Sequence, residues 1–318
     1  MMNQKIAGIL MAGGLLAGLN IACAQDFPNR PLRIISSEPG GGTDFLARVI
    51  AQGISGPLGQ PVIVENRPAG PTQGEMLARA QPDGYTLIST TSSLWLSAFM
   101  QKVFFDAGKD FAPITLAVTS HSVLVTHPSV PVKSVKELIA YAKSKPGELN
   151  YASSSTGSSS NLSMELFKSM VGVDIVRIPY KATGPAMVGL VSGQVQAMFS
   201  PTGPAVPQVK SGKLIALAVS SAQPSSLFPG LPTVAATVPG YQVVTSYGIL
   251  TRANTPQPVI NRLNSEIVRA LTAPDAKERL LQAGLEVEAS SPAHLAATIK
   301  SERSVLGKVI KDAGIRAE

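Results

Sequence analysis

Two loops rich in small polar residues carry the groups best suited to binding a ligand. The first is Ser36–Asp44, with the sequence SSEPGGGTD, and the second is Ala152–Asn161, with the sequence ASSSTGSSSN. Each lies between a short apolar stretch typical of a strand and an amphipathic stretch typical of a helix. The first amides of a helix lack intrahelical acceptors and lie at the positive end of its dipole, which favours anions. We therefore predict two strand–loop–helix anion sites that hold one ligand from two sides.

Other residues near predicted strand ends extend this candidate site. Asp44 either accepts a hydrogen bond from the ligand or only complements the helix dipole. Lys181 either supplies a positive charge to the ligand or is a solvated surface lysine. The second loop could alternatively be a flexible serine linker. The predicted ligand-binding residues are Ser37, Gly41, Gly42, Thr43, Asp44, Ser92, Ser154, Ser155, Thr156, Gly157, Ser158, Ser159, Tyr180, Lys181, Gln196 and Ser200.

The N-terminus has the pattern of a cleaved secretory signal peptide. Lys5 precedes an apolar run from Ile6 to Ile21, and Ala22-Cys23-Ala24 has the small-x-small form of a cleavage site. We expect a signal peptide over residues 1–24 and export to the periplasm. A transmembrane anchor is the first alternative, but the run is shorter than the roughly 20 residues that a span needs. Lipidation of Cys23 is the second, although Asn20 does not fit a typical lipobox.

Composition limits the remaining function classes. The chain of 318 residues has a formal net charge of +7, and its lysines and arginines are scattered, which argues against a nucleic-acid-binding surface. Cys23 is the only cysteine, so the mature chain holds itself together without disulfides. A mature length of about 290 residues would normally divide into two domains.

Apolar strand-like stretches alternate with helical ones through the first two thirds of the chain, which predicts parallel sheets with covering helices. Ser134-x-x-Glu137 is a capping box that opens a helix over Val135–Ser144. The C-terminal third is helical, and the proline cluster Pro201–Pro207 is typical of a loop. The predicted strands are Leu32–Ile35, Val62–Glu65, Thr86–Thr90, Ile114–Val118, Val123–Thr126, Ile175–Ile178, Gln196–Phe199 and Leu214–Val219.

Enzyme classes with recognisable motifs are not supported. The chain has no Gly-x-Ser-x-Gly elbow and no Gly-x-x-x-x-Gly-Lys-Ser/Thr loop, and Gly40–Gly42 lacks the spacing of a dinucleotide fingerprint. His121, His127 and His294 lack metal-ligand spacing, so we expect neither a metal nor a cofactor. A serine hydrolase that pairs a serine of residues 153–160 with His121 or His127 remains as an alternative.

An ordered series of segments resembles the solute-binding proteins of tripartite tricarboxylate transporters, also called the Bug family. The resemblance covers essentially the whole mature chain. Its segments are Pro28–Ile34 with Pro39–Asp44, Leu58–Val62 with Glu65–Pro68, Pro82–Leu87, Lys145–Gly147, the serine loop with Leu162–Phe167, Pro179–Lys181, Gly193–Val195, Met198-Phe199 and Gly212–Leu214.

The resemblance implies an α/β, two-domain Venus-flytrap periplasmic binding protein, each domain a mostly parallel sheet flanked by helices. The chain would cross twice between domain 1, residues 26–126 plus 246–318, and domain 2, residues 127–245. It also implies a monomeric receptor that binds a small carboxylate with both loops and delivers it to the membrane permease subunits. A sensor that presents its closed form to a membrane kinase would have the same sequence pattern.

Several positions depart from the pattern of the family. Ser37 stands where an aromatic residue is common, and Glu38 adds a negative charge beside the first loop. Ala182, Gln196 and Ser246 replace a glycine, an acidic residue and a tryptophan that are often found. We therefore expect the fold to follow the family more closely than the identity of the ligand does.

Overall fold

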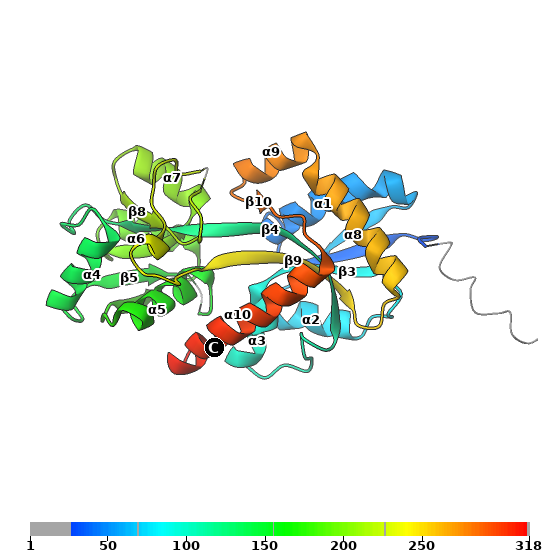
Figure 1. The fold of residues 1–318 in the computed structure, drawn as a ribbon, viewed down its shortest axis with the longest axis horizontal. Helices are drawn as coiled ribbons and strands as arrows, with labels where there is room; N and C mark the ends of the chain where they lie inside the picture. Colours follow the sequence, from blue (N-terminus) through cyan, green and yellow to red (C-terminus); the bar gives the residue numbers. More distant parts are fainter. Residues whose placement is uncertain (1–26, 69, 155, 226, 317–318) are drawn as a thin grey trace, which may run out of the picture.

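A computed structural model of the chain describes residues 27–68, 70–154, 156–225 and 227–316. The predicted signal peptide and Ser155 lie outside the described residues. The described part forms two lobes that are bridged by two long strands, β4 and β9 (Figure 1). The strands are β1 (Leu32–Ser36), β2 (Val62–Asn66), β3 (Thr86–Thr91), β4 (Phe111–Thr126), β5 (Asn150–Ser153), β6 (Val176–Pro179), β7 (Ala197–Pro201), β8 (Ile215–Val219), β9 (Val244–Arg252) and β10 (Glu286–Val287).

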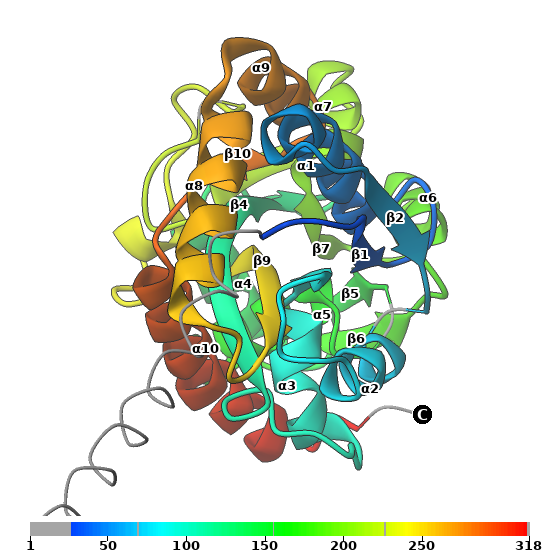
Figure 2. The ribbon, with the colours of Figure 1, turned by 90° about the vertical axis from the view of Figure 1, so that its right-hand side faces the viewer.

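Helices cover the sheet of each lobe on both faces. In lobe 1, α1, α8 and α9 lie on one face, and α2, α3 and α10 lie on the other (Figure 2). The helices are α1 (Gly42–Leu58), α2 (Pro71–Ala78), α3 (Ser92–Met100), α4 (Val135–Ser144), α5 (Ser159–Val171), α6 (Thr183–Val191), α7 (Thr202–Lys210), α8 (Gln257–Thr272), α9 (Pro274–Gln282) and α10 (Pro292–Asp312), with a 3-10 turn at Val234–Ala236.

The strand order is β2-β1-β3-β9-β4-β7-β5-β6, and β8 and β10 also pair with β4. The predicted α/β fold is confirmed, and the sheet is mixed. The β2-β1-β3 strands of lobe 1 and the β6-β5-β7 strands of lobe 2 are parallel, whereas β4 and β9 pair antiparallel with their neighbours. The strand-to-helix loops therefore leave the carboxyl ends of the parallel strands, where α/β proteins place their ligands.

Strand β4 joins two stretches that the sequence predicted as separate strands. The two predicted strands leave out the polar residues Thr119–Ser122, but Thr119 pairs with Ser246, and His121 with Val244. From Ser122 onward β4 pairs with β7 instead, and the Ser122 amide donates to Ser220 Oγ at 2.9 Å. Polar residues can stay in a buried strand when their neighbours satisfy them, so β4 continues from one lobe into the other. We propose that the domains divide as predicted, at 126/127 and 245/246.

The expectation of a loop over Pro201–Pro207 was wrong. Helix α7 spans Thr202–Lys210, with Pro207 inside it. A proline in the first turn costs little because its missing N–H would have no helical acceptor, and Pro204 occupies that turn. The capped helix at Ser134, in contrast, is α4 with the predicted bounds.

The two lobes share one hydrophobic core on the side of α10. This core continues from Trp95 and Leu295 in lobe 1 to Leu162 and Phe167 in lobe 2. Separate cores lie under α1 and α8 in lobe 1 and under α6 in lobe 2. Because opening a shared core would expose apolar surface, we infer that the lobes hinge on the α10 side.

Candidate ligand-binding site

A hollow of about 170 Å³ lies at the carboxyl end of the parallel strands of lobe 1. It is bounded by the loop between β1 and α1, the junction of β3 with α3, one residue of α2, and strand β9. Every lining side chain is uncharged, and most carry a hydroxyl or an amide. The lining residues are Ser37, Gly42, Thr43, Gln73, Thr90, Thr91, Ser93 and Tyr247.

Two helices begin at this hollow, α1 at Gly42 and α3 at Ser92. Thr91 caps α3 by accepting a hydrogen bond from the Ser93 amide, and Ser37 Oγ and Thr43 Oγ1 are hydrogen-bonded to each other. The amides of the first turns have no intrahelical acceptors, and both dipoles place their positive ends here. The hollow thus offers neutral donors and positive potential, a combination that suits a carboxylate.

Tyr247 is a lining residue that the sequence analysis did not select. A Cβ placed on Gly42 would lie 2.8 Å from the Tyr247 hydroxyl oxygen, so this hydroxyl lies directly over the start of α1. The hydroxyl has no hydrogen-bond partner among the described residues, and burial raises its pKa. It is therefore a neutral donor that stays available to a ligand. The Tyr247-Gly248 step at a predicted crossover was the sequence feature that could have indicated it.

The carboxylate of Glu302 fixes two of the elements that form the hollow. It accepts hydrogen bonds from Trp95 Nε1 at 2.7 Å and from Ser246 Oγ at 2.5 Å. Trp95 lies in α3, and Ser246 directly precedes Tyr247 in β9. Burial raises the pKa of Glu302, and these two hydrogen bonds oppose that rise. Helix α10 thereby sets the relative positions of α3 and β9.

Asp44, for which the sequence left a ligand contact and a helix-dipole role as alternatives, is buried and does not line the hollow. Its oxygens accept hydrogen bonds from the Gly40 amide at 2.9 Å, Arg48 Nε at 3.0 Å and Asn66 Nδ2 at 2.7 Å. Burial opposes ionisation, but these hydrogen bonds and the charge of Arg48 lower the pKa of Asp44 to about 2. Because its acceptor sites are occupied by protein donors, we propose that Asp44 positions the loop.

Two other residues of the first loop, Glu38 and Gly41, do not line the hollow. The Gly41 amide donates to the Glu38 carbonyl at 3.3 Å, so it is not free for a ligand in this conformation. The Glu38 side chain is exposed to solvent. Of the predicted residues, the hollow therefore gathers Ser37, Gly42 and Thr43, while Ser92 lies between the lining residues Thr91 and Ser93.

The serine loop lies in lobe 2, and part of its hydrogen-bonding capacity is used internally. The Ser154 amide donates to Ser160 Oγ at 3.1 Å, and the Gly157 amide donates to Asn161 Oδ1 at 3.0 Å. Ser158 caps α5 by accepting from the Asn161 amide. The described residues of the loop thus hold one another by hydrogen bonds, and Thr156 and Ser159 are half-buried.

Lobe 1 touches the serine loop at Gly157. A Cβ placed there would lie 2.3 Å from Met100 Sδ, at the end of α3, and Gly157 has a φ of +74°. Helix α3 thus begins at the hollow and ends against the serine loop. The predicted arrangement of one loop in each lobe is present, although the hollow itself is lined by lobe 1.

The other predicted residues of lobe 2 are dispersed. Gln196 lies at the amino end of β7, where its side chain accepts from the Asn150 amide at 2.9 Å, so it is remote from the carboxyl ends of the strands. A Cβ on Gly189 would lie 2.2 Å from the Tyr180 hydroxyl oxygen, so Tyr180 packs on α6. These contacts point to structural roles for Gln196 and Tyr180.

Two further predicted residues differ in exposure. Ser200 is fully buried near the carboxyl end of β7 and donates to the Pro201 carbonyl at 2.9 Å. Lys181 is exposed on the loop that leads into α6. Neither residue lines the hollow of lobe 1.

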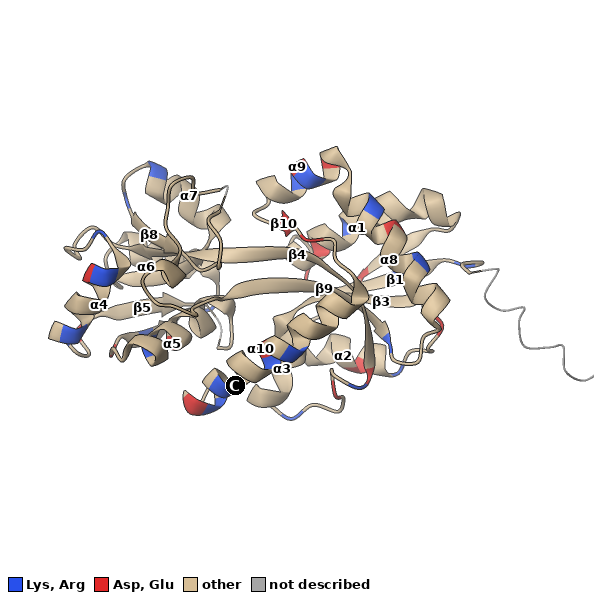
Figure 3. Ribbon diagram, in the orientation of Figure 1, with Lys and Arg blue, Asp and Glu red and all other residues tan. Residues whose placement is uncertain are grey.

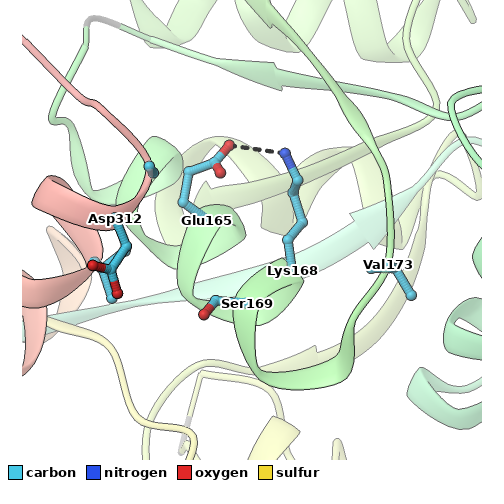
Figure 4. A pocket seen from close by; sticks show the side chains of 7 residues that line it. Glu165, Lys168, Ser169, Val173 and Asp312 are labelled. Carbon is cyan, nitrogen blue, oxygen red and sulfur yellow. Dashed lines mark hydrogen bonds and ion pairs between the residues drawn. The ribbon is translucent and has the colours of Figure 1, made fainter.

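A second hollow, of about 280 Å³, lies between α5 and the end of α10. Lys168 faces Glu165 across a distance of 3.2 Å, while Asp312 approaches from α10 (Figure 4). This hollow is larger, but its lysine is already paired and its other charged groups are acidic. It is therefore a poorer anion site than the hollow of lobe 1.

Charged groups and histidines do not form another centre in the described part of the chain. Lysines and arginines are scattered over both lobes (Figure 3). No group of three or more His, Cys, Asp or Glu side chains among the described residues is arranged to hold a metal ion. His127 Nδ1 is 2.7 Å from Ser129 Oγ, and no hydrogen bond joins a histidine to a described serine of residues 153–160. None of the described helices has the length and apolar character needed to cross a membrane.

Comparison with known proteins identifies the family. The model of the tripartite tricarboxylate transporter family receptor matches residues 46–315. Protein BugT from Bordetella pertussis is 33% identical over 319 residues, which cover 98% of this chain and 97% of that protein. A protein from Pseudomonas sp. strain P51, named for its place in the tcbD-tcbE intergenic region, is 33% identical and covers 92% of this chain and 88% of the relative.

Solved structures agree in fold. R. palustris Rpa4515 with adipate has a TM-score of 0.76 and 32% identity, covering 92% of this chain and 100% of that one. MatC from Rhodopseudomonas palustris with bound malate has a TM-score of 0.71 and 31% identity, covering 89% and 100%. Each similarity covers about nine tenths of this chain and the whole of the other protein. The chain belongs to the tripartite tricarboxylate transporter receptor family, whose members are periplasmic solute-binding receptors.

Proposed function

We propose that this protein is an extracytoplasmic receptor that captures a small carboxylate between its two lobes. The observation that carries the proposal is the hollow of lobe 1, in which two helices begin and all lining groups are neutral. Such a site can bind an anion without a reaction and without an ion pair. The adipate and malate of the two similar structures support a small dicarboxylate as the ligand class.

Binding would close the lobes around the ligand. One carboxylate would enter the hollow, where the Tyr247 hydroxyl and the first amides of α1 meet it. The serine loop would meet the other end, guided by the contact of Met100 with Gly157. The shared core along α10 would act as the hinge. The closed form would then be recognised by the permease subunits of a tripartite tricarboxylate transporter.

The chain would be exported, and it would bind its ligand without catalysing a reaction. The signal peptide over residues 1–24 would direct the chain to the periplasm, where it would act as a monomer. The hydrolase alternative required a histidine beside the serine loop. The contacts of His127 with Ser129 and of His121 with Glu286 argue against it.

Thermal unfolding of the mature chain against a panel of acids tests the proposal. The panel contains mono-, di- and tricarboxylates, with sugars and amino acids as controls. A ligand at 100 times its Kd adds about 2.7 kcal/mol to the free energy of unfolding, which raises Tm by a few degrees. We expect a rise with one family of carboxylates. A folded protein that responds to none of them, or that hydrolyses an ester, would contradict the proposed function.

A further inference from the structure

Arg177 is a charged group beside the serine loop that the proposed site does not yet use. It lies in β6, the edge strand of lobe 2, and its side chain reaches over the end of β5. Nε donates to Ser153 Oγ at 2.8 Å, and Nη2 donates to Thr156 Oγ1 at 3.2 Å. Thr156 directly precedes Gly157, where lobe 1 touches the loop. The guanidinium therefore lies beside the part of the serine loop that lobe 1 touches.

The charge of Arg177 is not compensated by the described part of the chain. The other half-buried arginines each face an acid within 4 Å: Arg33 faces Glu65, Arg252 faces Asp110, and Arg303 faces Asp106. Arg177 forms no ion pair with any described residue, although it is also half-buried. Removing a cation from water without a partner is unfavourable, so a half-buried arginine is usually paired.

The hydrogen-bonding capacity of Arg177 is also incomplete. A guanidinium has five N–H donors, and the two bonds to Ser153 and Thr156 leave the others without partners among the described residues. Thr156 accepts from Arg177, so its own hydroxyl proton remains available to a third group. Planar, paired N–H donors match the two oxygens of a carboxylate.

We propose that Arg177 recognises the second carboxylate of the ligand and makes the receptor selective for dicarboxylates. This inference rests on the proposed function and assigns one end of the ligand to the hollow of lobe 1 and the other to Arg177. Thr156 holds the guanidinium in place and shares the same carboxylate. Lys181, the cation that the sequence suggested for this role, is exposed on the following loop.

Binding of adipate and of its monomethyl ester by calorimetry tests this assignment. The ester keeps one carboxylate and most of the shape of the diacid. In the wild type we expect the diacid to bind more tightly than the ester. Arg177→Gln should weaken adipate binding about 10- to 100-fold but leave ester binding nearly unchanged, because only the diacid uses the guanidinium.

Two variants separate recognition from general effects. Arg177→Lys keeps the charge but loses the paired donors, so it should retain part of the preference for the diacid. Lys136→Gln removes one exposed charge from α4 of the same lobe and should leave the preference intact. An equal loss of diacid and ester in Arg177→Gln would show that Arg177 only holds the loop, and would overturn the inference. A loss of diacid binding in Lys136→Gln as large as that in Arg177→Gln would also overturn the inference. A wild type that binds no carboxylate would instead refute the proposed function, and this inference with it.

Discussion

Replacement of Tyr247 by phenylalanine removes one oxygen atom from the hollow of lobe 1. The hydroxyl lies over Gly42 and has no partner among the described residues, so no hydrogen bond within the described protein is lost. A hydrogen bond from a neutral donor to a charged group contributes about 1.5–3 kcal/mol. We therefore predict that Tyr247→Phe raises the Kd for the carboxylate roughly 10- to 150-fold and leaves the stability of the free protein unchanged.

Tyr241 provides a matched control in lobe 2. Its hydroxyl is buried and donates to the Ser163 carbonyl at 3.0 Å, away from the hollow. Tyr241→Phe should lower the free energy of unfolding by about 0.5–1.5 kcal/mol and leave the Kd unchanged. Calorimetric titration gives the Kd of each variant, and urea unfolding without ligand gives the stability.

The two tyrosine variants should thus change different quantities. Tyr247→Phe should change the Kd, and Tyr241→Phe should change the free energy of unfolding. Full affinity in Tyr247→Phe would refute the placement of a carboxylate under the Tyr247 hydroxyl. A loss of stability in Tyr247→Phe as large as that in Tyr241→Phe would show that the hydroxyl is a structural group with a partner inside the protein. Either result would require another site for the ligand.

Three further substitutions test the supporting contacts. Asp44→Asn should weaken ligand binding and lower stability by about 1–3 kcal/mol at pH 7. The pKa of Asp44 is about 2 in the folded protein, below the usual 3.8. The extra stability of the wild type over Asp44→Asn should therefore be lost as the pH falls from about 4 to 2, which acid unfolding curves would show. Burial raises the pKa of Glu302, so its contribution to the free energy of unfolding is present below pH 4.5 and is lost as the pH rises. Urea unfolding of Glu302→Gln at several pH values should not show this loss of stability. Gly157→Ala should lower stability by about 1–2 kcal/mol because φ is +74°, and adding Met100→Ala should recover only the part due to crowding. A pH profile of Asp44→Asn or Glu302→Gln that matches the wild type, or full recovery in the Gly157 double variant, would contradict these assignments.

Residue patterns predicted most elements that have local causes. The capping box at Ser134 indicates a helix because Ser134 Oγ accepts from the Glu137 amide, an interaction within four residues. The loop before Gly42-Thr43 likewise joins a strand to a helix as predicted, whereas its role as an anion site stays a prediction. These features depend on neighbours in sequence, so the sequence is sufficient to recognise them.

Features that depend on distant partners could not be predicted in the same way. The predicted strands stopped at Val118 and resumed at Val123, but β9 and Ser220 provide backbone partners that continue the strand through Thr119–Ser122. Tyr247 reaches the hollow only because β9 pairs antiparallel with β3, opposite Thr91. Arg177 was not selected because its partners, Ser153 and Thr156, are more than twenty residues earlier.

The structure also changes which substitution is informative at Gly157. An aspartate there would add a negative charge to the serine loop, and loss of binding would seem to support an anion site. Its Cβ would lie 2.3 Å from Met100 Sδ, and the backbone has a φ of +74°, so the variant would also be strained. Tyr247→Phe and Arg177→Gln avoid this ambiguity because neither adds atoms.

A crystal structure of the mature protein with the acid that gives the largest rise in Tm would locate the ligand directly. We expect one acid molecule between the lobes, with a carboxylate within hydrogen-bonding distance of the Tyr247 hydroxyl and the first amides of α1. Its other end should contact the serine loop. An acid bound in the hollow between α5 and α10, or held by lobe 2 alone in a closed molecule, would contradict the account.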